Sequence, residues 1–208
     1  MKTIEVKVYK YSELNDAAKA KAREWFRGVA QHDDFWSECV IDDAKSVAKI
    51  MGIEICDIYF SGFSSQGDGA CFTGEYRNAE NCAEKVKGYA PQDKELYRIA
   101  YGLQALQIAN SSGLWADIKH RGRYSHSGCM EIGIEQTAVN ASGNYLELSE
   151  DVEKDLSKLF RDFADWIYRQ LEKEYDYQNS DEELAEGIVS NEYDFLSSGA
   201  RFNNVVTA

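Results

Sequence analysis

Residues 61–72, with the sequence SGFSSQGDGACF, form the densest cluster of chemically distinctive side chains in the chain. Serine hydroxyls and successive backbone amides in a glycine-rich turn can hold a phosphate or another anion. An aspartate in such a turn can instead accept hydrogen bonds from its own loop. No lysine follows at P-loop spacing, and no GxGxxG motif is present. The favoured interpretation is therefore a structural hairpin loop. The second interpretation is a loop that binds a ligand or partner through Ser64, Ser65, Gln66 and Asp68.

Residues 119–126, KHRGRYSH, form the one basic island in an acidic chain. Histidines beside arginines near a turn could hold an anion or a metal, or transfer protons. A solvated hairpin tip is the simpler interpretation, because no third metal ligand stands at a recognisable spacing. If this island folds beside residues 64–66, the two loops would form a nucleotide-sized pocket, but the sequence does not place them together. The candidate residues here are His120, Arg121, Arg123 and His126.

The chain carries 36 acidic and 23 basic residues, a formal net charge of −13. Direct binding to nucleic acid is disfavoured, because that needs clustered lysine and arginine. Residues 150–194 hold 15 of the acids against five bases. Such a surface could occupy the basic groove of a nuclease or similar protein as phosphates would, although a salt-bridged solvent face has the same composition. The predicted partner surface consists of Glu174, Asp176, Asp181, Glu182, Glu183 and Glu186.

Hydrophobic periodicity predicts the elements that must position these residues. We expect a first strand over residues 3–11, which buries Ile4, Val6 and Val8, and two hairpins with elaborate loops. The fold class is α+β: a mostly antiparallel sheet of about five strands, covered on one face by helices, with a long C-terminal helix. One domain is expected over residues 1–196, followed by a polar, partly disordered tail over 197–208. Hairpins are predicted at 53–60 with 70–76 and 114–120 with 129–135, and helices at 17–29, 35–51, 78–90, 93–110, 149–177 and 180–191.

Five cysteines are widely spaced and none forms a CxxC pair, which favours reduced thiols and makes zinc improbable. No run of about 18 apolar residues is present, and the first residues alternate like a strand instead of forming the apolar core of a signal peptide. We therefore expect a protein of the host cell cytoplasm without cofactor, metal or membrane partner. Its oligomeric state is not predicted.

Residues 58–72, IYFSGFSSQGDGACF, resemble the signature of a widespread family of phage and prophage proteins. Its members are usually labelled hypothetical, or antitoxin of a toxin–antitoxin stability system. The resemblance implies a phage context, in which small acidic proteins commonly bind and block host enzymes. The resemblance extends over nearly the whole chain, and includes the opening strand and residues 15–26, 89–96, 120–122, 166–172 and 190–193.

The leading hypothesis is a non-enzymatic, acidic inhibitor or antitoxin-like protein that binds a basic host defence or toxin protein, of the nuclease or CRISPR-effector type. The alternative is a small-molecule module that sequesters a nucleotide signal through the two hairpin loops. A hydrolase built around His120, His126 and Asp68 is the least favoured class, so we predict no catalytic residue.

Overall fold

The structure is a computed structural model that describes residues 5–30 and 35–203. Contacts between Cα atoms divide the chain into two compact units, residues 39–172 and residues 1–38 with 173–208. The single domain expected over residues 1–196 stays a prediction. Each unit is described by itself below.

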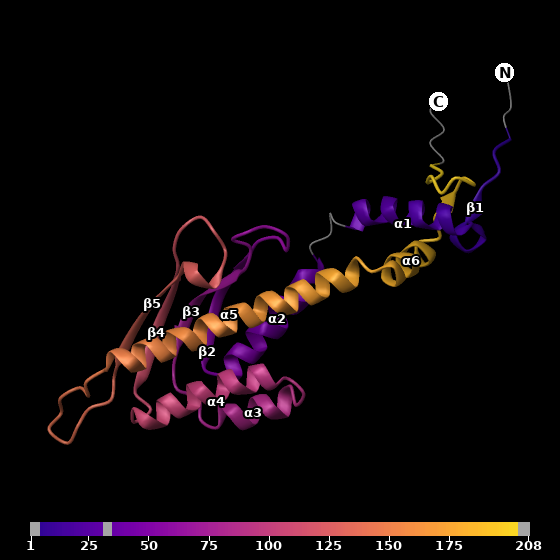
Figure 1. Ribbon diagram of the computed structural model, residues 1–208. Helices are drawn as coiled ribbons and strands as arrows, with labels where there is room; N and C mark the ends of the chain where they lie inside the picture. Colours follow the sequence, from indigo (N-terminus) through magenta and orange to yellow (C-terminus); the bar gives the residue numbers. More distant parts are fainter. Residues whose placement is uncertain (1–4, 31–34, 204–208) are drawn as a thin grey trace. The chain divides into compact units, whose positions relative to one another are not determined.

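The larger unit, residues 39–172, is built on a four-stranded antiparallel sheet made of the two predicted hairpins (Figure 1). The strand order is β2-β3-β4-β5, so the hairpins meet through β3 and β4 and the edges are β2 and β5. Apolar residues alternate along these strands, as expected of a sheet that buries one face. The strands are β2 (Ile53–Phe60), β3 (Ala70–Tyr76), β4 (Leu114–His120) and β5 (Met130–Gln136).

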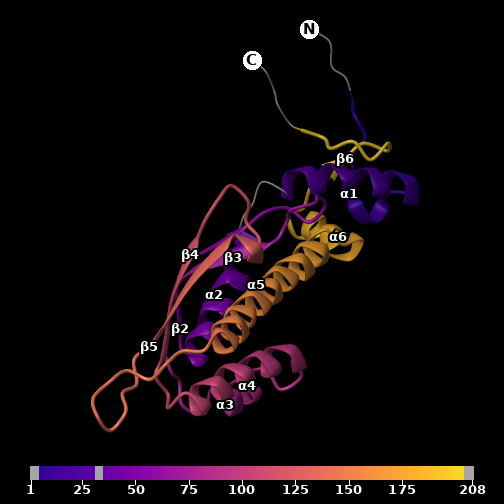
Figure 2. The same cartoon turned by 60° about the vertical axis from the view of Figure 1, so that its left-hand side comes forward.

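Four helices cover one face of this sheet (Figures 1 and 2). Ring contacts with α5 show how that face is buried: the ring centroids of Phe72 and Phe163 lie 5.8 Å apart, and those of Tyr76 and Phe160 lie 5.1 Å apart. All four rings are fully buried. The helices are α2 (Phe35–Ile50), α3 (Cys82–Tyr89), α4 (Lys94–Ala109) and α5 (Glu150–Gln178).

Asp93 joins α4 to α5. Its Oδ1 accepts the Leu96 amide at 2.8 Å and caps α4, while its Oδ2 accepts the indole N–H of Trp166 at 2.7 Å. Aspartate is a favoured N-cap because it satisfies an amide that has no partner within the helix. One side chain therefore both starts α4 and fixes it to the long helix.

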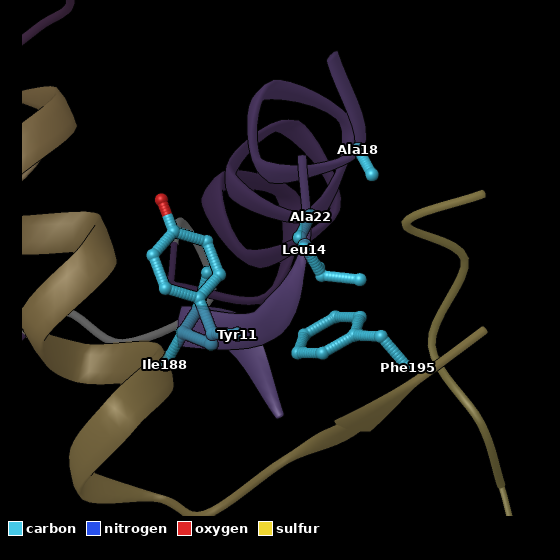
Figure 3. Packing of buried hydrophobic residues seen from close by; sticks show 6 residues of the cluster. All are labelled: Tyr11, Leu14, Ala18, Ala22, Ile188 and Phe195. Carbon is cyan, nitrogen blue, oxygen red and sulfur yellow. The ribbon is translucent and has the colours of Figure 1, made fainter. Parts of the chain in front are cut away.

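The smaller unit has its own core, formed by the start of the chain and its end (Figure 3). It contains β1 (Tyr9–Lys10), a short 3-10 turn, α1 (Asp16–Ala30), α6 (Asp181–Ser190) and β6 (Asp194–Phe195). β1 pairs antiparallel with β6. The buried residues of this core are Tyr11, Leu14, Ala18, Ala22, Ile188 and Phe195.

The α+β class, the two hairpins and the long C-terminal helix are confirmed, but the first strand differs from the prediction. The strand is confined to β1 and does not join the four-stranded sheet. Val6 and Val8, predicted to be buried, are 50% and 38% exposed. Ile4 lies outside the described residues. The prediction of a strand is therefore wrong at residues 5–8, because alternation of apolar and polar residues does not by itself supply a partner strand.

The predicted polar tail turns back on β6 as far as it is described. The Leu196 amide donates to Ala200 O and the Phe202 amide to Asp194 O, each at 2.8 Å. Residues 204–208 lie outside the described residues. Within the described ranges, no helix has the length and apolar composition needed to cross a membrane.

Candidate functional site

The loop between β2 and β3 is closed by Asp68. Its Oδ2 accepts the amides of Ser65 at 2.6 Å and Ser64 at 3.0 Å. These two amides, the Ser65 amide first, hold the pKa of the Asp68 carboxyl below its usual range. The backbone donors that could have held a phosphate are therefore turned toward the protein's own carboxylate. This geometry favours the structural interpretation of the loop over an anion-binding one.

We expect Asp68→Ala to raise the amide hydrogen exchange rates of Ser64 and Ser65 by about tenfold or more, because both amides lose a charged acceptor. Asp155→Ala, at an exposed position of α5, is the matched control and should leave these rates unchanged. The folded-state pKa of Asp68 is depressed. Wild-type protection should therefore be complete above about pH 3.9, the ordinary aspartate value, and be lost as the pH falls through the lower folded value. If neither Asp68→Ala nor the fall in pH changed the exchange rates of the Ser64 and Ser65 amides, Asp68 would not be their acceptor.

The same loop contacts α5 through Tyr168. The Tyr168 hydroxyl donates to Gly62 O at 2.9 Å, and the Phe63 ring stacks on Tyr168 with centroids 5.4 Å apart. Burial, and then the negative charge of Asp68, raises the pKa of Tyr168. The phenol therefore stays protonated and able to donate. Sequence analysis did not single out Tyr168 for this contact, because nothing in its local pattern points to a residue 106 positions away.

The loop between β4 and β5 follows His120, the last residue of β4. The His120 ring stacks on Tyr59 with centroids 4.9 Å apart, and its Nε2 donates to Tyr124 O at 2.9 Å. The next residue, Arg121, pairs with Glu131 at 3.0 Å. Arg123 is exposed and forms no ion pair with any residue in the described ranges. Arg121 is compensated by Glu131, and His120 and His126 are half-buried. Among the four basic-island candidates, Arg123 is therefore the one with an exposed charge and no ion pair within the described ranges.

His126 stands beside a cysteine that sequence analysis did not select. Its Nδ1 accepts the Gly128 amide at 3.1 Å, and its Nε2 lies 3.5 Å from the Cys129 sulfur. The H-x-x-C spacing could have suggested this pair. A nucleophilic cysteine needs a third group that orients its histidine, and no further hydrogen bond within the described ranges orients the His126 ring. Burial raises the pKa of the nearby Cys71 thiol to about 11. No three metal-ligating side chains gather anywhere in the described part of the chain.

The structure brings the two hairpin loops together. A Cβ built on Gly69 would lie 2.6 Å from the His126 Cβ, and one on Gly67 would lie 3.8 Å from the Tyr124 ring. Only a glycine at position 69 permits this close approach, because any side chain would overlap His126. Ser64, Ser65, Gln66, Arg121 and Arg123 are exposed around this junction, whereas Asp68, His120 and His126 are half-buried.

The predicted acidic residues lie in the other unit, at the end of α5 and on α6. Asp181 is compensated by α1, since its carboxylate lies 2.8 Å from Arg23 and 3.6 Å from Arg27. The count of acids and bases within residues 150–194 therefore missed the two arginines that compensate Asp181. Asp176, Glu182 and Glu186 are exposed and form no ion pair within residues 5–30 and 35–203.

Carboxylates of this region gather around Tyr177. The pKa of its phenol is raised, first by the hydrogen bond to Glu183 and then by the negative charges of Glu183, Glu186 and Glu174. We use the name acidic patch for these carboxylates and their exposed neighbours: Glu174, Asp176, Glu182, Glu183 and Glu186.

Comparison with known proteins matches residues 36–181 to a domain of unknown function, DUF8835. No curated protein and no solved structure matches the chain. The matched region runs from α2 through α5 and includes the four-stranded sheet with both hairpin loops. Because the match covers more than half of the chain, the protein belongs to the DUF8835 family.

Proposed function

We propose that the protein is a non-enzymatic, antitoxin-like inhibitor from a phage, which binds and blocks a basic host defence or toxin protein of the nuclease or CRISPR-effector type. The observation that carries the proposal is the acidic patch, whose charges raise the pKa of Tyr177. Carboxylates that repel one another at a surface gain most from a partner that supplies the missing positive charge. The resemblance of residues 58–72 to phage proteins supports a bacterial target.

Two features of the patch suit a protein partner. Tyr177 is 57% exposed in the middle of the carboxylates, and tyrosine is favoured at interface hot spots. Glu182 and Glu183 lie in the first turn of α6, where they also stabilise the helix dipole. Glu186 lies beyond that turn, so the dipole does not account for its position. The net charge of −13 adds a long-range attraction to basic partners.

Replacing Glu182 and Glu186 with glutamine is expected to weaken the complex about tenfold or more at low salt and to flatten its salt dependence. The tagged, full-length protein would be incubated with nuclease-treated bacterial lysate, and retained proteins identified at low and high salt. The partner would then be purified and its affinity measured for wild-type protein and variants.

The matched control is Glu80→Gln with Glu84→Gln, which removes the same charge from exposed positions of the larger unit. It should leave the affinity near the wild-type value. A partner that is acidic, or a complex that is insensitive to salt and to the Glu182 and Glu186 changes, would refute the proposal. An equal loss of affinity in the control would show that the effect depends on the overall charge of the protein and not on the acidic patch.

A further inference from the structure

β5 is an edge strand, and among the described residues no strand pairs with its outer side. The register of β4 with β5 runs without a bulge from Leu114↔Gln136 to His120↔Met130. Just beyond the strand ends, the Arg121 amide donates to Cys129 O and the Thr137 amide to Gly113 O. Both bonds fit the register of the strands, in which residue 121 lies opposite residue 129 and residue 113 opposite residue 137. In an antiparallel ladder, hydrogen-bonded pairs alternate with pairs that are not hydrogen-bonded to each other. The odd-numbered residues of β5 therefore bond to β4, and the even-numbered ones face outward.

Ile132 and Ile134 also line a groove beside α5. The groove has a volume of about 710 Å³ and is lined by β5 residues 132–134 and by the first half of α5, including Lys154 and Arg161. The Arg161 guanidinium already donates to one outward carbonyl, that of Met130, at 3.5 Å. Unpaired edge groups of this kind are a template for one more strand.

The other edge of the sheet is less suited to accept a strand. β2 carries a register shift between Ile55 and Asp57, and a bulge twists an edge and interrupts pairing. The hollow beside β2 is smaller, at about 430 Å³. Of the two edges, only β5 offers seven residues in one continuous register.

The chain itself contains a segment with the matching pattern. Residues 5–8, EVKV, belong to no helix or strand, and Val6 and Val8 are about half exposed although they alternate as strand residues do. In antiparallel register Val6 falls opposite Ile132 and Val8 opposite Met130, on the apolar side of β5. Lys7 then falls opposite Glu131 on the polar side. Glu5 falls opposite Gly133, which has no side chain.

We infer that the free edge of β5 accepts residues 5–8 of a second copy of this chain as a fifth strand, so that two copies exchange N-terminal strands. One register of the simpler pairing, β5 with β5 of a second copy, is disfavoured. When centred on Gly133 it places Glu131 of one copy opposite Glu135 of its partner, and like charges directly opposite destabilise a strand pair.

The inference is tested on the full-length chain by analytical ultracentrifugation over a range of concentrations. The wild-type protein should form a concentration-dependent dimer. Ile132→Pro removes only an outward N–H and leaves the ladder with β4 intact, because proline is tolerated at such edge positions. This variant and Val6→Asp should each weaken the dimer about tenfold or more. A chain that is monomeric at all concentrations, or a dimer that Val6→Asp leaves unchanged, would overturn the inference; a dimer weakened by Ile132→Pro alone would instead indicate pairing of β5 with β5.

A crosslink tests the register without relying on affinity. Positions 7 and 131 form a non-hydrogen-bonded pair in the inferred register, with Cα atoms about 4.5 Å apart, which suits a disulfide. Lys7→Cys with Glu131→Cys should yield a covalent dimer under mild oxidation. Lys7→Cys with Glu135→Cys, and Lys7→Cys alone, are the controls for register and for the native cysteines. A crosslink within a single chain, or equal yields from all three variants, would refute the exchange.

Discussion

Phe195→Ala is expected to destabilise the smaller unit by about 3–5 kcal/mol, the usual cost of removing a buried phenylalanine side chain. Phe195 is fully buried and lies within the core shown in Figure 3. Its ring also meets Trp25 edge-on, with centroids 5.8 Å apart. This unit is small, so a loss of that size is comparable with its whole stability. Hydrogen exchange followed by mass spectrometry should show fast exchange in α1 and α6.

The same measurement separates the two compact units. Phe195 packs against Trp25 and the buried core of its own unit, so exchange in β2 to β5 should stay slow in this variant. Phe163→Ala should have the opposite effect, because Phe163 is fully buried between Phe72 and Trp166 in the larger unit. It should cost about 3–5 kcal/mol and expose the sheet.

Two exposed apolar residues provide the controls for this pair of variants. Val189→Ala on α6 and Ile108→Ala on α4 remove side chains that are 56% and 69% exposed, and each should change stability by less than about 0.5 kcal/mol. If Phe195→Ala and Phe163→Ala both unfold the whole chain in one transition, the chain is the single cooperative domain that its sequence predicts. That outcome would contradict separate unfolding of the units.

Local patterns were sufficient to predict most of the elements. The alternation in residues 53–60 and 114–120 predicted β2 and β4 with the bounds that the structure has. The pairing of Tyr9 with Phe195 was beyond such patterns. A strand of two residues has no periodicity to recognise, and its partner lies at the opposite end of the chain. The ion pair between Arg23 and Asp181 was not predicted either, because its two residues lie far apart in the sequence and charge balance was judged only within residues 150–194.

The candidate site was predictable within each loop but not between loops. That Asp68 would cap amides of its own loop followed from residue types alone, and its hydrogen bonds with the Ser64 and Ser65 amides confirm it. The contact of Gly69 with His126 depends on the register between β3 and β4, which places the two loop ends side by side. No local pattern encodes that register. The nucleotide-binding alternative stays a prediction, weakened because Asp68 already occupies the loop amides.

Gly52→Ala is expected to cost about 2–5 kcal/mol, since it adds two penalties at the point where α2 turns into β2. Gly52 has a φ of +84°, a left-handed conformation that costs a residue with a side chain about 1–2 kcal/mol. A Cβ at this position would also lie 2.1 Å from Arg77 O. The Gly52 carbonyl accepts the Arg77 amide at 2.9 Å, so relieving the overlap would disturb the first bond of the β2–β3 hairpin. Overpacking of this kind adds about 1–3 kcal/mol.

Gly143 isolates the conformational part of that penalty. Its φ of +81° is nearly the same, but nothing lies within 4 Å of the position that a Cβ would take. Gly143→Ala should therefore cost only about 1–2 kcal/mol, and the difference between the two variants in urea denaturation measures the backbone contact at Gly52. Equal losses would mean that the contact with Arg77 relaxes freely and that only the dihedral angle requires glycine. A larger loss at Gly52, with β2 and β3 the first strands to exchange, would show that the hairpin carrying the Asp68 loop depends on this close approach.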